Sequence, residues 1–161
     1  MTSVQERLYI DAPYVQTADA LVRRLGIAKG AARGECTLSL VLPVAGGRDI
    51  ARTVKARTER VGTDADYLSR YSVAWDAGLT ARGIPTPAFS GTLIVSAGED
   101  YRETSLLIEG EYEPPGGPAG RAFDDLLGRR MAHATLAALL SGVGDELTAA
   151  YERVESAKRA G

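Results

Sequence analysis

The amino-acid sequence predicts an α+β fold in which a curved antiparallel sheet wraps around one long C-terminal helix. Two observations carry this prediction. Between Glu35 and Pro115 apolar residues recur at every second position, as they do in half-buried strands. From Ala119 to about Arg153 they recur at steps of three, four and seven, as on one face of a helix. A one-sided sheet must bury its apolar face, and this helix is the only predicted element large enough to cover it.

The predicted C-terminal helix has a marked start and a weaker end. Pro118 is tolerated in a first helical turn, where an N–H would have no partner. Gly142 and Gly144 each cost about 1 kcal/mol against alanine inside a helix, so a bend or fraying is predicted there. The charged tail, about 154–161, is expected to be ragged. The apolar stripe expected to face the sheet consists of Leu126, His133, Leu136, Leu140, Val143 and Leu147.

The sequence before Glu35 predicts one strand and one short helix. Val4 to Ile10 alternates between apolar and polar residues, and Asp11-Ala12-Pro13 marks a turn. Gly26 follows two arginines and is a typical helix stop signal. The apolar positions of the short helix are Val15, Ala18, Val22 and Leu25.

Five further strands are predicted after Glu35. They span Thr37–Val44, Ile50–Val61, Tyr67–Trp75, Phe89–Val95 and Tyr101–Glu113. Short connections between successive strands imply an antiparallel meander with one face in solvent. The segment Leu79 to Pro87 has too many prolines and glycines for regular structure, and we expect it to gate a ligand site. Gly91 and Gly110 stand at inward positions, where they mark either bends and cavity volume or simple bulges.

Length and composition restrict the class of protein. A chain of 161 residues is long enough for one domain with its own core, so residues 1–161 are assigned to a single domain. A net charge of −2 gives no general attraction to nucleic acid or to anionic membranes. No segment reaches the roughly 20 apolar residues that cross a bilayer, and the lone Cys36 fits a reducing compartment. We expect a cytoplasmic monomer or homodimer that does not insert stably into membranes.

The order of these elements resembles that of a known superfamily. The similarity is carried by Leu107–Gly120, LIEGEYEPPGGPAG, which leads into Arg129–Leu140, RRMAHATLAALL. Over nearly its whole length the chain is similar to the helix-grip superfamily, which includes Bet v 1-like, START-like and polyketide cyclase-like (SRPBCC) proteins. The resemblance implies a curved antiparallel sheet, usually of seven strands, and a deep hydrophobic cavity between sheet and helix. Six strands are identified in this sequence, so the prediction is a sheet of six to seven.

The superfamily does not determine an activity. Similar proteins include carriers of lipids, sterols and quinones, aromatase/cyclases acting on polyketides, hormone receptors and chaperone regulators. Ring-hydroxylating oxygenases of this superfamily need an iron held by two histidines and one carboxylate. The sequence has one histidine, which excludes that branch. It also lacks GxSxG, HExxH, Walker A and CxxC motifs, so neither a metal nor a cofactor is expected.

The candidate site residues are those expected to face the cavity. His133 is placed on the inward stripe as a general base, a ligand contact or a hydrogen-bonded structural residue. Aromatic side chains with polar tips suit an apolar pocket, with core packing as the alternative. Arg130, one turn before His133, is placed either at a ligand carboxylate or at the surface. The predicted ligand-binding residues are Tyr71, Trp75, Phe89, Tyr112, Arg130, His133 and Leu136, and His133 is the candidate catalytic residue.

Two functions of different classes follow. The first is the binding or carriage of a small hydrophobic molecule such as a lipid, a quinone or a polyketide-like compound; it is favoured because no coupled acid–base pair is visible. The second is a cyclase or dehydratase in which His133 or a tyrosine moves a proton while the cavity folds the substrate. A third is a protein-interaction module on the outer face of the sheet. The charged residues of that face are more simply explained as a solvent-exposed surface. Arg52, Arg60 and Arg70 break the alternation of their strands and lie either in the cavity or at an edge.

Overall fold

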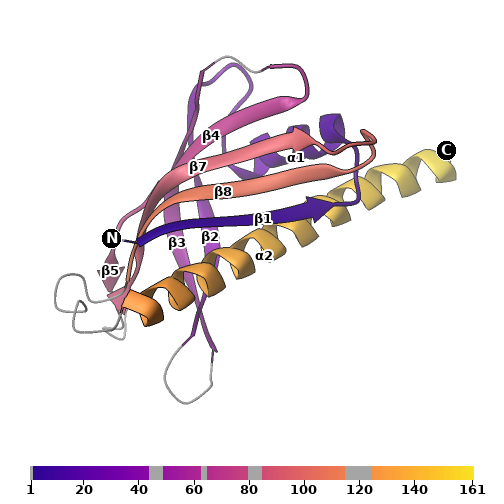
Figure 1. The fold of residues 1–161 in the computed structure, drawn as a ribbon. Coiled ribbons are helices and arrows are strands. Elements are labelled where there is room, and N and C mark those ends of the chain that lie inside the picture. The colour runs from indigo at the N-terminus through magenta and orange to yellow at the C-terminus, as the bar shows by residue number, and fades with distance from the viewer. Residues whose placement is uncertain (1, 44–48, 63–64, 80–84, 115–124) are drawn as a thin grey trace.

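The structure is a computed structural model that describes residues 2–43, 49–62, 65–79, 85–114 and 125–161 (Figure 1). Its elements in chain order are β1 (Thr2–Ile10), α1 (Tyr14–Arg24), β2 (Arg33–Pro43), β3 (Asp49–Arg60), β4 (Leu68–Trp75), β5 (Gly78–Leu79), β6 (Pro85–Thr86), β7 (Ala88–Ala97), β8 (Thr104–Glu113) and α2 (Asp125–Ala160). The predicted start of the long helix, including Pro118, lies outside the described residues.

The main sheet is a six-stranded antiparallel meander with β1 added at one edge. Its order is β1-β8-β7-β4-β3-β2. β3 pairs with β2 from Asp49 to Glu59 but with β4 only from Arg57 to Arg60. The β2–β3 hairpin therefore separates from the other strands toward its Asp49 end, and the sheet is open and curved (Figure 1). The predicted α+β fold of a curved antiparallel sheet with a long C-terminal helix is confirmed.

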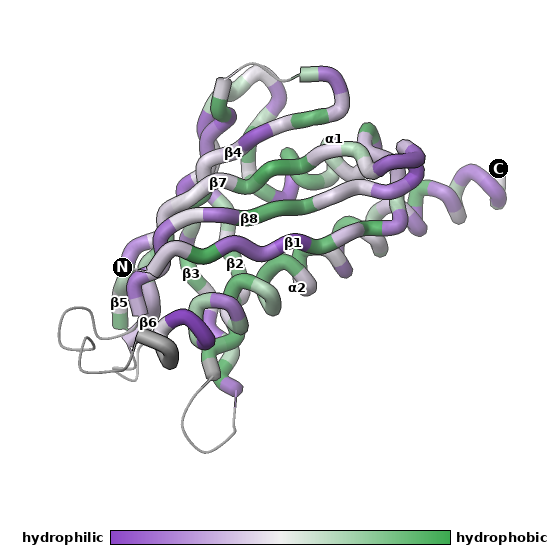
Figure 2. Tube along the Cα trace, viewed as in Figure 1, coloured by the Kyte–Doolittle hydropathy of each residue, from purple (hydrophilic) through white to green (hydrophobic). Residues whose placement is uncertain are grey.

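Helix α2 packs against β1 and β2, the two strands at opposite edges of the sheet. Alternate residues of each strand point to the α2 side, which we call the inner face. On β8 the inner-face residues Leu106, Ile108 and Tyr112 are buried, whereas Glu109 and Glu111 on the outer face are exposed. Figure 2 shows α2 largely hydrophobic along the sheet and hydrophilic toward its C-terminal end. The helix thus closes the open side of the sheet through one apolar face.

The face of α2 that meets the sheet keeps most of the predicted stripe but is shifted around the helix toward Ala132, Thr135 and Leu139. Leu136 and three other predicted members belong to it, the side chain of Leu126 is outside the described part, and His133 is exposed. The prediction that His133 points inward is therefore wrong. The buried positions of α2 are Gly128, Ala132, Thr135, Leu136, Leu139, Leu140, Val143, Gly144 and Leu147.

Small residues explain this shift of the helix face. A Cβ atom on Gly144 would lie 2.4 Å from Cδ2 of Leu8 on β1. Real Cβ atoms do not approach a carbon so closely, so glycine allows a close contact between α2 and β1 at this point. A pattern that counts only large apolar residues gives no weight to such positions, although Gly144 marks a close approach of helix and sheet.

The C-terminal half of α2 is more regular than predicted. α2 is one continuous helix from Asp125 to Ala160, so neither the fraying expected at the two central glycines nor the ragged segment 154–161 is observed. Lys158 and Arg159 lie in the last turn, where positive charge interacts favourably with the helix dipole. Lys158 Nζ also lies 3.1 Å from Glu155 Oε1.

Several segments outside the long elements differ from expectation. β8 begins at Thr104, because Tyr101 has a left-handed backbone with φ +58° that a strand does not contain. The segment expected to be irregular holds β5 and β6, which pair with each other as a separate two-stranded sheet. Residues 80–84 of the predicted gate lie outside the described part. Val15 of α1 is exposed, because that helix packs through Thr17 and Leu21 instead.

Gly91 and Gly110 are partners in an unbroken β7–β8 register, so neither is a bulge. A Cβ on Gly91 would lie 2.1 Å from the carbonyl oxygen of Glu109, and one on Gly110 would lie 2.4 Å from that of Ser90, so both glycines allow a close approach of the partner backbone. The same two Cβ atoms would lie 2.6 and 2.9 Å from Cζ of Phe89. The Phe89 ring therefore occupies the inner-face space that two side chains would need. The glycines accommodate an aromatic ring rather than open cavity volume.

Candidate functional site

Four predicted aromatic residues lie together on the inner face. Trp75 of β4 pairs with Phe89 of β7, which pairs with Tyr112 of β8, so the three form one row across neighbouring strands. The Trp75 and Phe89 rings stack, with centroids 4.9 Å apart and an interplanar angle of 29°. Tyr71 lies four residues before Trp75 on the same face of β4. Leu136 of α2 belongs to the same buried core.

These side chains are packed against protein atoms rather than around an open space. Their exposed fractions are between 0% and 2% for Tyr71, Trp75, Phe89, Tyr112 and Leu136. A cavity wide enough for a water molecule would leave accessible surface on its lining residues. The deep cavity that the family resemblance implies is therefore closed at these five residues, and their contact with a ligand stays a prediction.

The polar tips of the row are hydrogen-bonded within the protein. Trp75 Nε1 donates to the carbonyl oxygen of Pro87 at 3.1 Å, and the Tyr112 hydroxyl lies 3.3 Å from Thr135 Oγ1. Burial raises the pKa of the Tyr112 phenol above its usual value, an effect that the Thr135 hydroxyl partly opposes. Tyr112 is therefore a neutral hydrogen-bonding group at physiological pH. The sequence interpretation missed Thr135; its signal is a hydroxyl residue within an apolar helix face.

His133 lies on the flank of α2 beside strand β1. Its side chain is 52% exposed, and Nδ1 lies 2.5 Å from Oε1 of Glu6, whose side chain is 24% exposed. Glu6 occupies an inner-face position of β1, between the apolar Val4 and Leu8. A carboxylate in that alternation was the available signal for the partner of His133. Arg130 is also exposed, so the structure does not bring these two predicted residues together with the aromatic row.

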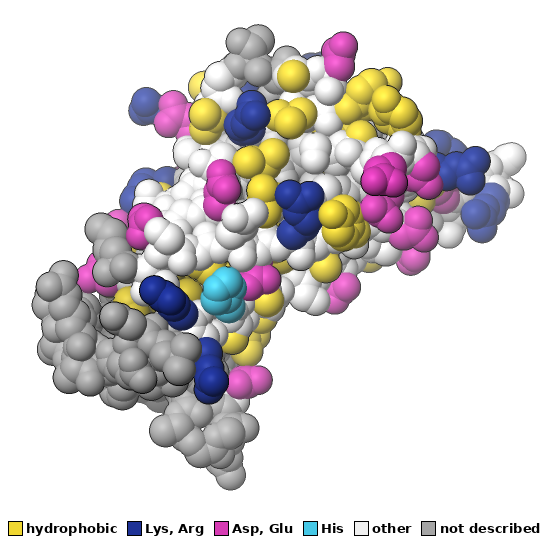
Figure 3. All heavy atoms as spheres, in the orientation of Figure 1, with side chains coloured by type: hydrophobic (Ala, Val, Ile, Leu, Met, Phe, Trp, Pro, Cys, Tyr) yellow, Lys and Arg dark blue, Asp and Glu magenta, His cyan; other side chains and the backbone are white. Residues whose placement is uncertain are grey.

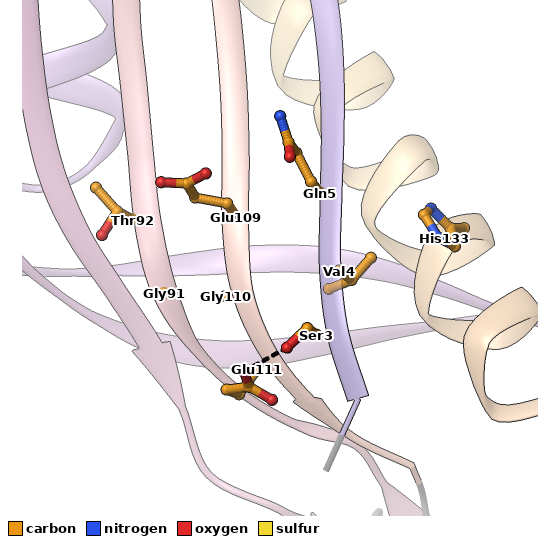
Figure 4. A pocket seen from close by; sticks show the side chains of 9 residues that line it. All are labelled: Ser3, Val4, Gln5, Gly91, Thr92, Glu109, Gly110, Glu111 and His133. Carbon is orange, nitrogen blue, oxygen red and sulfur yellow. Dashed lines mark hydrogen bonds between the residues drawn. The ribbon is translucent and has the colours of Figure 1, made fainter. Parts of the chain in front are cut away.

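A shallow surface cleft of about 640 Å³ runs along the outer face of β7, β8 and β1 as far as His133 (Figure 4). Outer-face side chains flank it, and Ser3 Oγ donates to Glu111 Oε1 at 2.6 Å. Its floor includes the backbone of the two paired glycines. The cleft is lined by Ser3, Val4, Gln5, Gly91, Thr92, Glu109, Gly110, Glu111 and His133.

A second cleft, of about 380 Å³, lies beside the outer face of β3. Arg57 donates to both carboxylate oxygens of Asp76, at 2.7 and 3.2 Å. This hydrogen-bonded guanidinium holds the pKa of the Asp76 carboxyl below its usual value. Both side chains are exposed, so the pair is a surface feature rather than part of a buried site.

The three arginines that break the strand alternation have different positions. Arg60 lies over the Tyr71 ring, with its guanidinium carbon 5.8 Å from the ring centroid. Arg70 is exposed on β4. Arg52 is half-buried on the inner face of β3, opposite Leu40 of β2. Its Nη1 donates to the carbonyl oxygen of Ala51 at 2.8 Å, while its buried Nε has no partner within the described part of the chain.

The described residues contain no group of three or more His, Cys, Asp or Glu side chains arranged to hold a metal ion. Among the helices of that same part, none combines the length and the apolar character required to cross a membrane.

Comparison with solved structures decides the fold. TTHA0849 from Thermus thermophilus is 18% identical to this chain, covers 92% of it and 99% of its own length, and superposes with a TM-score of 0.54. This similarity extends over the same sheet and C-terminal helix. The chain has the helix-grip fold. The helix-grip fold expected from the sequence is thereby confirmed.

Two further solved structures are similar to this helix-grip chain at a lower level. XoxI from Bacillus cereus is 12% identical, with 96% of this chain and 99% of that chain covered and a TM-score of 0.48. The Zhui aromatase/cyclase from Streptomyces sp. R1128 is 17% identical, with 96% and 93% covered and a TM-score of 0.48. Neither adds to the assignment of the helix-grip fold. No protein-family model matches the sequence, and no curated protein matches it.

Proposed function

We propose that the protein binds a small, largely apolar molecule between the inner face of the sheet and α2. The observation that carries this proposal is Arg52. Its neighbours on the inner face are apolar, with Leu40 opposite and Ile50 and Val54 two residues away along β3. An unpaired buried donor costs about 1–3 kcal/mol, and more when it is charged. A ligand with an anionic or carbonyl oxygen would supply the partner that Nε lacks among the described residues.

The accessibility of the inner face favours a ligand position near the Asp49 end of β3. Ile50, Arg52 and Val54 are half-buried, whereas Ala56 and Thr58 farther along the strand are buried. The same end is where β3 has no pairing with β4. The aromatic row then forms the closed, packed end of the site, and a longer ligand would have to displace its side chains.

The chemistry of this surface indicates an amphipathic ligand. Aliphatic inner-face side chains bind apolar groups through burial, at about 25 cal/mol per Å² of apolar surface removed from water. A guanidinium adds a charge-assisted hydrogen bond to a carboxylate, phosphate or polarised carbonyl. Lipids, quinones and polyketide-like molecules all combine an apolar body with such an oxygen. We further expect a cytoplasmic protein that is a monomer or a homodimer.

A second candidate is a cyclase or dehydratase that uses the same cavity. The pair His133–Glu6 favours it, because a carboxylate at Nδ1 orients an imidazole as a general base. This candidate is weaker, since His133 lies at the open outer cleft and in solvent rather than on the buried inner face. A His133→Ala variant separates the two functions: an enzyme would lose turnover and keep its ligand, whereas a carrier would keep its affinity.

Binding of anilinonaphthalene sulfonate, an apolar probe with one anionic group, tests the proposed function. Trp75 is the only tryptophan and lies on the inner face, so energy transfer from it reports a probe bound nearby. We expect Arg52→Met to weaken binding by about tenfold or more, the loss expected for one charge-assisted hydrogen bond. Arg70→Met, which removes an exposed arginine of β4, is the matched control and should leave binding unchanged. Absence of binding by both this probe and neutral Nile red would refute the proposal.

A further inference from the structure

Three tyrosines form a cluster at the end of the sheet where α1 begins. Tyr14 opens α1, Tyr67 precedes β4, and Tyr101 lies in the turn between β7 and β8. The ring centroids of Tyr14 and Tyr67 are 5.8 Å apart at 70°, and those of Tyr67 and Tyr101 are 5.1 Å apart at 65°, both edge-to-face. Tyr67 is 50% exposed and Tyr101 is 61% exposed. We call these three residues the tyrosine cluster.

The two exposed tyrosines have an unfavourable backbone conformation. Tyr67 has φ +60° and Tyr101 has φ +58°, and within the described ranges they are the only residues other than glycine with positive φ. Bulky side chains rarely adopt this left-handed conformation, which glycine and asparagine tolerate well. Hydrogen bonds fix both loops: Ala97 N donates to Tyr67 O at 3.0 Å, and Gly98 N donates to Glu103 O at 2.6 Å. Strain that a fold maintains at an exposed position is a reason to look for a binding role.

Exposed acidic residues lie on the same three connections as the tyrosine cluster. The three connections that carry it are adjacent, because Thr104 Oγ1 donates to Ala12 O at 2.7 Å and the Ala97–Tyr67 bond joins the other two. Figure 3 shows hydrophobic side chains at this end of the molecule with acidic side chains beside them. Arg102 is the one basic residue on these segments as described. The exposed acidic residues are Asp11, Asp66, Glu99, Asp100 and Glu103, and none of them forms an ion pair within the described chain.

We propose that the tyrosine cluster and its acidic rim bind an arginine-containing segment of another protein. A guanidinium stacks on the face of a tyrosine ring while its N–H groups remain free to pair with carboxylates. Tyrosine and arginine are also enriched among the residues that contribute most to binding at protein interfaces. Anionic membranes and nucleic acids are disfavoured partners, because the rim carries the same sign of charge.

This surface is separate from the proposed ligand site. Arg52 lies near the Asp49 end of β3, whereas Tyr67 follows the opposite end of that strand. Failure of one proposal therefore does not affect the other, and the variants that test them do not overlap.

The test is titration of the full chain with a synthetic peptide of alternating glycine and arginine, at about 150 mM salt so that weak long-range attraction is screened. The variant Tyr67→Asn with Tyr101→Asn removes both rings but suits the left-handed backbone. An unchanged or higher Tm will show that it is folded. We expect peptide affinity to fall about tenfold, as for the loss of stacked aromatic anchors. Tyr9→Ala, which removes an exposed tyrosine on the outer sheet face, is the matched control and should change affinity little.

The acidic rim is tested in the same titration. Glu99→Gln with Glu103→Gln should weaken binding, while Glu109→Gln with Glu111→Gln, on the outer face of the sheet, should not. Three results would overturn the proposal: no binding at about 1 mM peptide, the weakest affinity of interest; wild-type affinity in the asparagine variant; or equal losses in both pairs of glutamate variants. Tyrosine-dependent binding to neutral phosphatidylcholine vesicles without peptide binding would assign the surface to a membrane instead.

Discussion

The close contact between α2 and β1 can be tested at two glycines of α2 that are separated by a single residue. We predict that alanine has different effects on stability at the two sites. A Cβ on Gly142 meets no atom within 4 Å, whereas one on Gly144 would lie 2.4 Å from Leu8 Cδ2. Alanine at either site gains about 1 kcal/mol of helix propensity. At Gly144 the new methyl group also forces Leu8 to move, and overpacking of this kind costs about 1–3 kcal/mol. We therefore expect Gly142→Ala to stabilise the protein and Gly144→Ala to be neutral or destabilising.

Thermal unfolding measures this difference. For a chain of this size, about 1 kcal/mol corresponds to a change of about 2–4 °C in Tm. Gly142→Ala should raise Tm by about that amount, and Gly144→Ala should leave it unchanged or lower it. In a Leu8→Ala background the clash is absent, so Gly144→Ala should then stabilise as Gly142→Ala does. Equal Tm changes for the two single variants would show that Leu8 moves aside at no cost in stability, and would refute the reasoning.

Further predictions concern buried polar groups and the strained loops. Tyr112→Phe should cost about 1–2 kcal/mol in the free energy of unfolding, because it leaves the Thr135 hydroxyl buried without its partner, and the double variant Tyr112→Phe with Thr135→Val should recover most of the loss. The pKa of Tyr112 is raised above its unfolded value of 10.0, so the native state holds this proton more tightly than the unfolded state does. The contribution of Tyr112 to stability should therefore be constant below pH 10 and fall above it. Denaturant titrations should show a smaller loss of stability at alkaline pH for Tyr112→Phe. Arg52→Met should raise the Tm of the ligand-free protein while weakening probe binding, because it removes a buried donor that has no partner among the described residues; a lower Tm would contradict this. Tyr67→Gly should change stability by less than about 1 kcal/mol or increase it, as relief of left-handed strain offsets the lost ring contacts, and a loss of several kcal/mol would show that the conformation is not strained.

The main features of the fold were predictable because they depend on periodicity. Alternation at step two identified the strands, the short connections implied their antiparallel order, and the long apolar pattern identified the helix that covers them. The face of that helix was predicted correctly at Leu136, Leu140, Val143 and Leu147 but not at His133. The contact is made through Gly128, Ala132 and Gly144, whose small side chains carry no weight in a pattern of large apolar residues. His133 was consequently placed inward although it pairs with Glu6 at the surface.

The candidate site was predictable only in part, for a different physical reason. The alternation correctly placed Tyr71, Trp75, Phe89 and Tyr112 on one face, but it does not report whether facing side chains leave a space or fill it. The packing of the Phe89 ring over two paired glycines depends on the register between β7 and β8. That Nε of Arg52 has no partner in the described ranges likewise depends on three-dimensional contacts that a single strand pattern does not contain.

The pairing of β1 with β8 has a consequence for how the chain reaches its folded state. Thr2 pairs with Tyr112, and the helix that packs on β1 follows later still in the sequence. Contacts between such distant residues form late and slowly, because closing a long loop costs conformational entropy before any contact compensates for it. During synthesis the first strand must therefore remain without its native neighbours while more than half of the chain emerges. Polar residues alternate with the apolar ones of β1, among them Ser3, Gln5 and Arg7. They keep the unpaired strand hydrated and oppose its pairing with other nascent chains.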